Sequence, residues 1–225
     1  MTSHRLSSGH LTVGLLLLAG AGMRLWQYLG HASLWVDEIK LARNIVERPL
    51  AALVTEPLQW HQVAPPGFLA LERLLVEGLG PDEWVLRLIP LAAGLLTLPL
   101  FWALTARILA GPARMIARVL FAFSYSLVWY SSEVKQYSSD VLIALALTLI
   151  AINLPDRVRS GSWPVLASVA GPVACWFSTP AALVLGGLGA GLLVEAEWKG
   201  TIPPRAVLAV LVVWVAGSIA AGLVA

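Results

Sequence analysis

The chain has 225 residues, of which 58% are hydrophobic and only 12% are charged. This composition excludes a soluble domain, because a core of that size cannot hide so much apolar surface. The formal net charge of +2 is too small to indicate nucleic-acid binding, and the lone cysteine, Cys175, excludes an internal disulfide.

Long apolar runs predict an all-α, polytopic membrane protein with about seven spanning helices. The first run follows Arg5 and resembles a signal peptide, but an uncleaved span is the preferred interpretation because further spans follow. The predicted spans are 11–30, 87–108, 113–130, 139–154, 163–178, 180–195 and 206–225. Pro164 and Pro172 favour a broken or tilted helix in the fifth of them.

One further apolar stretch, 65–79, is short and carries Glu72, Arg73 and Glu77. Charges at the middle of a bilayer are costly, so we expect a shallow surface helix with these three side chains in water. The positive-inside rule supports this choice with the N-terminus inside. The inner connections then carry the cations Arg107, Arg114, Arg118, Arg157, Arg159, Lys199 and Arg205.

The same topology makes residues 31–86 one outer loop of a single membrane module, 1–225, with two amphipathic surface helices. In the first, 38–48, Leu41 and Ile45 lie on the apolar face, whereas Asn44 falls on the polar face. Pro49 ends that helix, and Pro65-Pro66 begins the second, 65–79.

Two acidic segments of the outer side are candidates for chemistry. Asp37 and Glu38 open the first surface helix, where Asp37 is either an N-cap or a carboxylate held at the mouth of a membrane cavity. The segment "WYSSEVKQYSSD" brings Glu133, Lys135 and Tyr137 into a tight turn between two spans. That turn is either a solvated loop with a Glu–Lys pair or a second wall of the same cavity.

His61 and Arg24 are weaker candidates. His61 is a possible ligand or proton carrier, although a lone histidine is more often a polar loop residue. Arg24, near the outer end of the first span, either extends to the lipid headgroups or binds an anionic phosphate, and the first alternative is preferred. The chain contains no Gly-rich phosphate loop, zinc-ligand spacing or nucleophile elbow.

Taken together, "RLWQYLGHASLWVDEIKLARNI", "APPGFLALERLL", "YSSEVKQYS" and "WFSTPAALVL" resemble segments of a known family. Their order and spacing are similar to those of bacterial integral-membrane glycosyltransferases of the GT-C fold, in the protein mannosyltransferase and aminoarabinose transferase group (family 39). The resemblance covers residues 20–200, approximately.

The resemblance implies a sugar transferred from a polyprenyl-phosphate carrier to a lipid, glycan or protein acceptor, outside a bacterial cytoplasmic (inner) membrane. It implies catalytic roles for Asp37, Glu38 and Glu133, and substrate binding by Lys135, Tyr137 and His61. Arg24 is a substrate-binding candidate through the phosphate alternative given above, and not through the resemblance. Lys135 stands where the family usually has Arg, and His61 is not directly before the double proline. A divalent metal, Mg²⁺ or Mn²⁺, held by Asp37 and Glu133 is a further expectation.

Alternatives remain open at this stage. The family usually continues with more spans, so the chain is expected to be an N-terminal part or to need a partner chain that supplies them. A transporter or flippase-like protein and a non-catalytic membrane partner are the other function classes. The position of the acids at one surface and the lack of a repeat count against transport.

Overall fold

A computed structural model describes residues 8–30, 32–157, 163–200 and 203–222, and this part of the chain is all-helical. The predicted all-α fold is therefore confirmed. The helices are α1 (Ser8–Leu29), α2 (Val36–Glu47), α3 (Leu50–Thr55), η1 (Gln59–His61), α4 (Pro66–Leu79), α5 (Glu83–Leu86), α6 (Leu88–Ile108), α7 (Gly111–Ala122), α8 (Tyr125–Trp129), η2 (Tyr130–Ser132), α9 (Tyr137–Arg157), α10 (Trp163–Phe177), α11 (Ala181–Lys199) and α12 (Pro204–Gly222).

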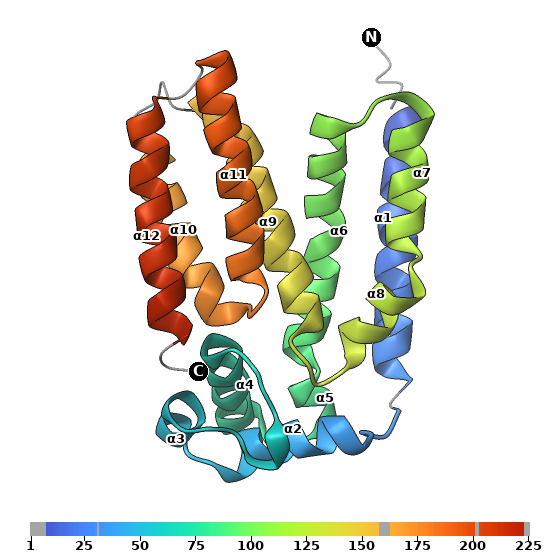
Figure 1. The fold of residues 1–225 in the computed structure, drawn as a ribbon. Coiled ribbons are helices and arrows are strands. Elements are labelled where there is room, and N and C mark those ends of the chain that lie inside the picture. The colour runs from blue at the N-terminus through green and yellow to red at the C-terminus, as the bar shows by residue number, and fades with distance from the viewer. Residues whose placement is uncertain (1–7, 31, 158–162, 201–202, 223–225) are drawn as a thin grey trace.

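The long helices form an antiparallel bundle (Figure 1). Helices α2 to α5, residues 32–86, lie together across one end of this bundle, and we call them the cap. The connection between α8 and α9 reaches the same end, whereas the connection between α6 and α7 and the start of α12 lie at the opposite end. The cap and the 130–136 turn are therefore neighbours, as the predicted topology requires.

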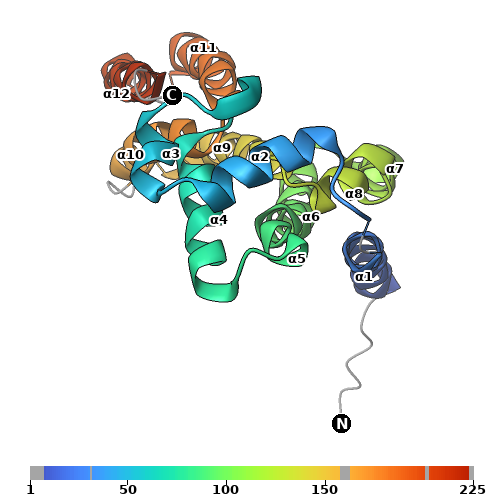
Figure 2. The same cartoon turned by 90° about the horizontal axis from the view of Figure 1, so that it is seen from below.

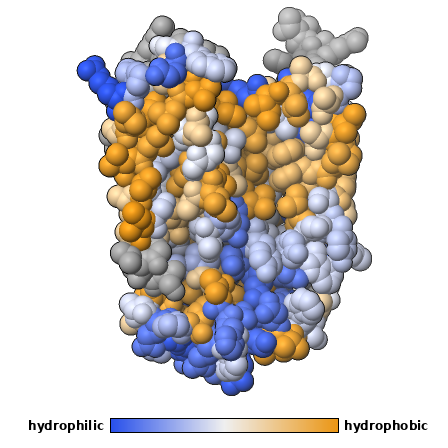
Figure 3. Space-filling model, viewed as in Figure 1, coloured by the Kyte–Doolittle hydropathy of each residue, from blue (hydrophilic) through white to orange (hydrophobic). Residues whose placement is uncertain are grey.

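Three helical segments in the described residues are long and apolar enough to cross a membrane, namely Glu83–Ile108, Tyr137–Leu154 and Ala181–Trp198. The apolar surface lies along the bundle, and polar surface covers the cap (Figure 3). These features support a membrane protein. The number of seven spans, the compartment and the orientation remain predictions.

The predicted span 113–130 is wrong as a single helix. Helix α7 ends at Ala122, and the chain turns through Phe123 and Ser124, whose ψ angle of 120° is not helical, before α8 begins at Tyr125. This break directs α8 and η2 toward the cap, so it helps to shape the site. The serine before α8 is typical of residues that start a helix, and that signal was present in the sequence.

The two predicted surface helices exist, as α2 and α4, with ends within a few residues of those expected. They pack on a common core with Val134 of the 130–136 turn, formed by Leu41, Ala42, Ile45, Ala64, Phe68, Leu69, Val76, Leu86 and Val134. Helix α4 lies across the end of the bundle rather than along it (Figure 2). A Cβ atom at Gly67 would be 2.8 Å from the Phe177 ring, so glycine lets α4 approach α10 closely.

The predicted wet faces of these two helices are partly wrong. Asn44 is fully buried, and its side-chain amide and carbonyl bind the backbone of Gln59. Glu72 is also fully buried on the core-facing side of α4. Arg73 extends to the C-terminal end of α2, where its Nη1 donates to the carbonyl of Val46 at 2.7 Å, and only Glu77 remains substantially exposed. The polarity of a side chain therefore did not predict whether it binds neighbouring backbone, as Asn44 and Arg73 do, or lies in solvent, as Glu77 does.

Helices α9 to α12 pack on a second apolar core. Apolar surface gives no driving force between helices in lipid, so close van der Waals packing must hold them together. Gly171 of α10 faces the Trp214 ring of α12, and a Cβ atom at this position would overlap that ring. Helix α10 continues through Pro172, so this segment is not broken between Trp163 and Phe177, and the alternative of a tilted helix stays a prediction.

Candidate functional site

A cleft of about 280 Å³ lies where the start of α2 meets α8, η2 and the turn before α9. We call it the acidic cleft. Its walls are rich in aromatic rings and carry two of the three predicted carboxylates. It is lined by Trp35, Asp37, Tyr125, Ser126, Trp129, Tyr130, Glu133, Lys135 and Tyr137. The fold therefore brings the two acidic segments into one site, although about a hundred residues separate them in the sequence.

Asp37 is held by two partners from different segments. Its Oδ2 lies 2.8 Å from the Nζ of Lys135, and its Oδ1 accepts a hydrogen bond of 3.0 Å from the Nε2 of Gln62. The hydrogen bonds from Lys135 and Gln62 hold the pKa of the Asp37 carboxyl below its ordinary value. Asp37 is therefore ionised at neutral pH, and about half of its side-chain surface remains accessible.

The N-cap interpretation of Asp37 is wrong. Helix α2 begins at Val36, with Trp35 as its N-cap residue, so Asp37 already lies inside the first turn. Glu38 instead satisfies the helix start, because its Oε2 accepts a hydrogen bond from the Trp35 amide at 3.2 Å. The side chain of Asp37 thus does not cap the helix and faces the cleft.

Glu38 joins three parts of the fold. It is almost fully buried, and its Oε1 accepts a hydrogen bond of 2.8 Å from the Val134 amide and lies 3.6 Å from the Nη2 of Arg87. Arg87 in turn donates to the Ala32 carbonyl at 2.6 Å. These contacts tie α2 to the 130–136 turn and to the start of α6, so Glu38 positions the site rather than lining the cleft.

Lys135 is buried in spite of its charge. Its side chain is only 7% exposed, and its Nζ donates to the Oε1 of Gln62 at 2.7 Å in addition to pairing with Asp37. Burying an ammonium group without partners would be costly, so the two partners explain how it is tolerated. The turn is therefore a wall of the cleft and not a solvated loop.

Glu133 faces the cleft from the same turn, and the indole Nε1–H of Trp129 donates to its Oε1. Burial raises the pKa of the Glu133 carboxyl above its ordinary value, and the Trp129 bond opposes that effect. Tyr137 lies beside it with its ring 4.8 Å from that of Tyr130. The acidic cleft thus holds one firmly ionised carboxylate and one that is easier to protonate.

The other two predicted site residues lie elsewhere. His61 lines a separate cleft inside the loop between α3 and α4. Arg24 is fully buried, and its Nη1 donates to the carbonyls of Gly20 and Ala122 at 3.0 and 3.1 Å. Its expected extension to the headgroups is wrong, because the guanidinium group instead joins α1 to the end of α7.

Sequence reasoning missed Gln62 and Arg87. Gln62 links Asp37 and Lys135, and Arg87 lies beside Glu38. Arg87 stood at the edge of a predicted span, where an unexplained cation was a usable signal. Gln62 gave no such signal, because neutral amides are common in loops.

The predicted metal site remains a prediction. No group of three or more His, Cys, Asp or Glu side chains suited to a metal occurs within the described ranges. In the observed arrangement Asp37 contacts an ammonium and an amide, both of which are donors and not metal ligands. In this arrangement Lys135 and Gln62 occupy the carboxylate oxygens of Asp37, and no step of the proposed mechanism depends on a metal.

Comparison of the chain with known proteins identifies no relative. No protein-family model matches the chain, and no curated protein or solved structure matches it.

Proposed function

We propose that this chain, alone or with further membrane helices, transfers a sugar from a polyprenyl-phosphate carrier to a hydroxyl acceptor at the acidic cleft. One observation carries the proposal. The segments that resemble the glycosyltransferase family meet in space, with the Oδ2 of Asp37 lying 2.8 Å from the Nζ of Lys135 in a cleft that Glu133 also lines.

The surroundings of the cleft suit such substrates. A sugar presents apolar C–H faces and polar edges, so aromatic rings beside carboxylates form a natural binding surface. Residues of α8 and the start of α9 line the cleft, and the surface along the bundle is apolar (Figure 3), so a lipid-borne sugar would reach the cleft from the membrane surface. Trp35 and Tyr125 are well exposed there and are available for contact.

Asp37 is the proposed general base. It takes the proton from the acceptor hydroxyl while the acceptor oxygen forms a bond to the anomeric carbon of the sugar. The bond between that carbon and the phosphate oxygen breaks, and its electron pair leaves with the phosphate. Lys135 offsets the charge that develops on the phosphate, which requires its ammonium group to turn from Asp37 toward the donor.

Glu133 and Glu38 have different proposed roles. Glu133 accepts hydrogen bonds from sugar hydroxyls at the cleft wall, and Trp129 fixes its orientation. Glu38 holds the Val134 amide and so sets the position of the turn that carries Lys135. Glu38 is therefore a positioning residue in this scheme.

The test is transfer by the chain in lipid nanodiscs. The donors are undecaprenyl phosphates that carry radiolabelled mannose, glucose or aminoarabinose, and bacterial membrane lipid and glycan extracts supply the acceptor. We expect label to pass to the acceptor with release of undecaprenyl phosphate. Asp37→Asn should reduce the rate by about 10²–10⁴-fold, whereas Asp82→Asn, at an exposed cap position, should not.

Unchanged transfer by Asp37→Asn would refute the proposed base. No transfer from any of the three donors, with the wild-type chain folded and co-expressed with its neighbouring reading frames, would refute the proposed function.

A further inference from the structure

A second cleft lies on the other side of Gln62. It has a volume of about 530 Å³ and occupies the hollow of the loop between α3 and α4, so we call it the loop cleft. It is lined by Leu53, Val54, Glu56, Pro57, Leu58, Trp60, His61, Gln62, Val63, Ala64, Pro66 and Leu69. Gln62 lines this cleft and binds both Asp37 and Lys135, so one side chain separates the loop cleft from the ion pair of the acidic cleft.

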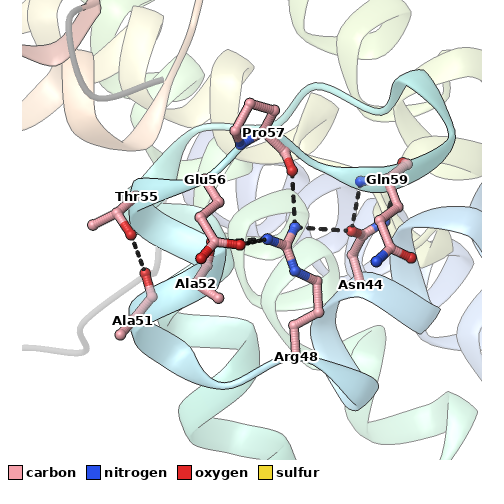
Figure 4. Close-up of polar contacts among 8 residues, drawn as sticks. All are labelled: Asn44, Arg48, Ala51, Ala52, Thr55, Glu56, Pro57 and Gln59. Atoms are coloured by element: carbon pink, nitrogen blue, oxygen red, sulfur yellow. Dashed lines mark hydrogen bonds and ion pairs between the residues drawn. The ribbon is translucent and has the colours of Figure 1, made fainter.

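Two side chains at the C-terminal end of α2, Asn44 and the C-cap residue Arg48, hold the wall of the loop cleft in place (Figure 4). The Oδ1 of Asn44 accepts a hydrogen bond of 2.9 Å from the backbone amide of Gln59. The guanidinium of Arg48 donates hydrogen bonds to the Pro57 carbonyl at 3.0 Å and to the Glu56 carboxylate at 2.7 Å. Asn44 is fully buried, and Arg48 is 11% exposed. The loop is thus fixed before any ligand binds, as in most small-molecule sites.

The backbone of the loop is strained at its tip. Trp60 and His61 both have φ angles of 56°, in the left-handed region where glycine is the favoured residue. Residues held in this region are strained unless the surroundings compensate, and strain of this kind is concentrated at binding and catalytic sites. The sequence has Trp and His here instead of glycine, so the conformation serves to present two ring side chains to the cleft.

The charges near the loop cleft are already paired. Glu56, the one carboxylate among the lining residues, binds Arg48. The guanidinium of Arg43 lies 4.8 Å from the centre of the Trp60 ring and also binds Glu47. A charged ligand would find no unpaired partner of opposite sign in these groups, so the cleft favours a neutral ligand. The cleft combines the rings of Trp60 and His61 and the amide of Gln62 with apolar side chains such as Leu69. This combination suits a carbohydrate, which presents both hydroxyls and C–H faces.

We propose that the loop cleft binds the acceptor as a neutral, hydroxyl-bearing sugar, and that Gln62 guides its reacting hydroxyl toward Asp37. The role of this sugar as the acceptor rests on the proposed function. Donor and acceptor then approach Asp37 from opposite sides, and Trp60 and His61 are specificity residues for the acceptor. Binding of a neutral sugar is itself independent of any transfer.

The experiment compares His61→Gly and Trp60→Ala with Trp26→Ala, a control that removes an exposed indole on α1 outside both clefts. Binding of methyl α-mannoside, methyl α-glucoside and methyl β-galactoside to the folded chain in nanodiscs is followed by saturation-transfer NMR, with mannose 6-phosphate as the charged comparison. Thermal midpoints are measured for the same samples. Where transfer is observed, KM for acceptor and for donor are measured separately.

We expect at least one neutral glycoside to bind more tightly than mannose 6-phosphate. His61→Gly and Trp60→Ala should each weaken the binding of that glycoside by about tenfold. His61→Gly should also raise or preserve the thermal midpoint, because glycine relieves the strain, and a purely structural role for His61 does not predict that combination. Any rise in KM should affect the acceptor and leave the donor KM unchanged.

The proposal is overturned if no neutral glycoside binds, if mannose 6-phosphate binds better, or if Trp26→Ala weakens binding as much as the cleft variants. The failures can be told apart. Glycoside binding that depends on Trp60 and His61 without transfer would contradict the proposed function alone. Transfer whose acceptor KM is the same in all three variants would contradict the loop cleft alone.

Discussion

The buried carboxyl of Glu72 gives the sharpest prediction about stability. Glu72 is fully buried on α4, and neither of its carboxylate oxygens has a hydrogen-bond partner. Burial raises its pKa from 4.5 to about 9. The folded chain therefore keeps the proton over a pH range in which the unfolded chain has lost it.

The sign follows from proton binding. Between pH 4.5 and pH 9 the folded state binds one more proton than the unfolded state at this residue, so stability falls as pH rises. The contribution of Glu72 is complete below pH 4.5 and is lost progressively up to the folded pKa. Each pH unit in this window is worth about 1.4 kcal/mol, so the free energy of unfolding falls by about 4 kcal/mol between pH 5 and pH 8.5.

The variant Glu72→Gln removes this titration and keeps the shape of the side chain. Because a neutral amide resembles the protonated carboxyl, we expect wild type and Glu72→Gln to have similar stability at pH 5. At pH 8.5 the variant should have the higher thermal midpoint, by about 10 °C for a chain of this size. The matched control is Glu77→Gln on the same helix, since Glu77 is 48% exposed and paired with Arg73.

The assay is intrinsic tryptophan fluorescence during heating in detergent micelles, at several pH values from 5 to 8.5, for all three proteins. The control Glu77→Gln should follow wild type, because an exposed ion pair contributes only about 0–1 kcal/mol. Parallel curves of midpoint against pH for wild type and Glu72→Gln would refute the reasoning, since they would show that Glu72 does not hold its proton in the folded state.

The remaining predictions concern the acidic cleft and the topology. Asp37→Asn should reduce transfer by about 10²–10⁴-fold and leave expression and helical content unchanged, because Asp37 is not the N-cap of α2. Helical content is measured by circular dichroism, and a loss of folding would contradict this prediction. Lys135→Met should raise the pKa of Asp37 and move the acidic limb of the pH–rate profile to higher pH, and an unmoved limb in transfer assays would contradict the ion pair. The first turn of α7 holds Ala113 and the start of α5 holds Glu83, and these helix ends lie at opposite ends of the bundle (Figure 1). In a Cys175→Ser background, Ala113→Cys and Glu83→Cys should therefore react with a membrane-impermeant maleimide from opposite sides, and labelling of both from one side would disprove the topology.

The sequence alone determined the helical class and most of the helix positions. Apolar runs, proline positions and loop charges each act over a few neighbouring residues, so they can be read without knowing the fold. They predicted the two surface helices found as α2 and α4, and they put Asp37 and Glu133 at one end of the bundle, where both line the acidic cleft. That α2 and α4 lie outside the spans stays a prediction. The family resemblance and its proposed chemistry also came from the sequence and stay proposals.

The tertiary structure decided what each polar side chain does. Whether Asp37 or Glu38 faces the cleft depends on where α2 starts, and that start is fixed by contacts with Val134 and Trp35. The partner of Asp37 is Lys135, and the fold alone could reveal that pair because nothing local links them. By helical periodicity Glu72 falls on the same face of α4 as Phe68 and Val76, but the charge of a carboxylate argued for solvent, and only the tertiary structure showed that Glu72 is buried there.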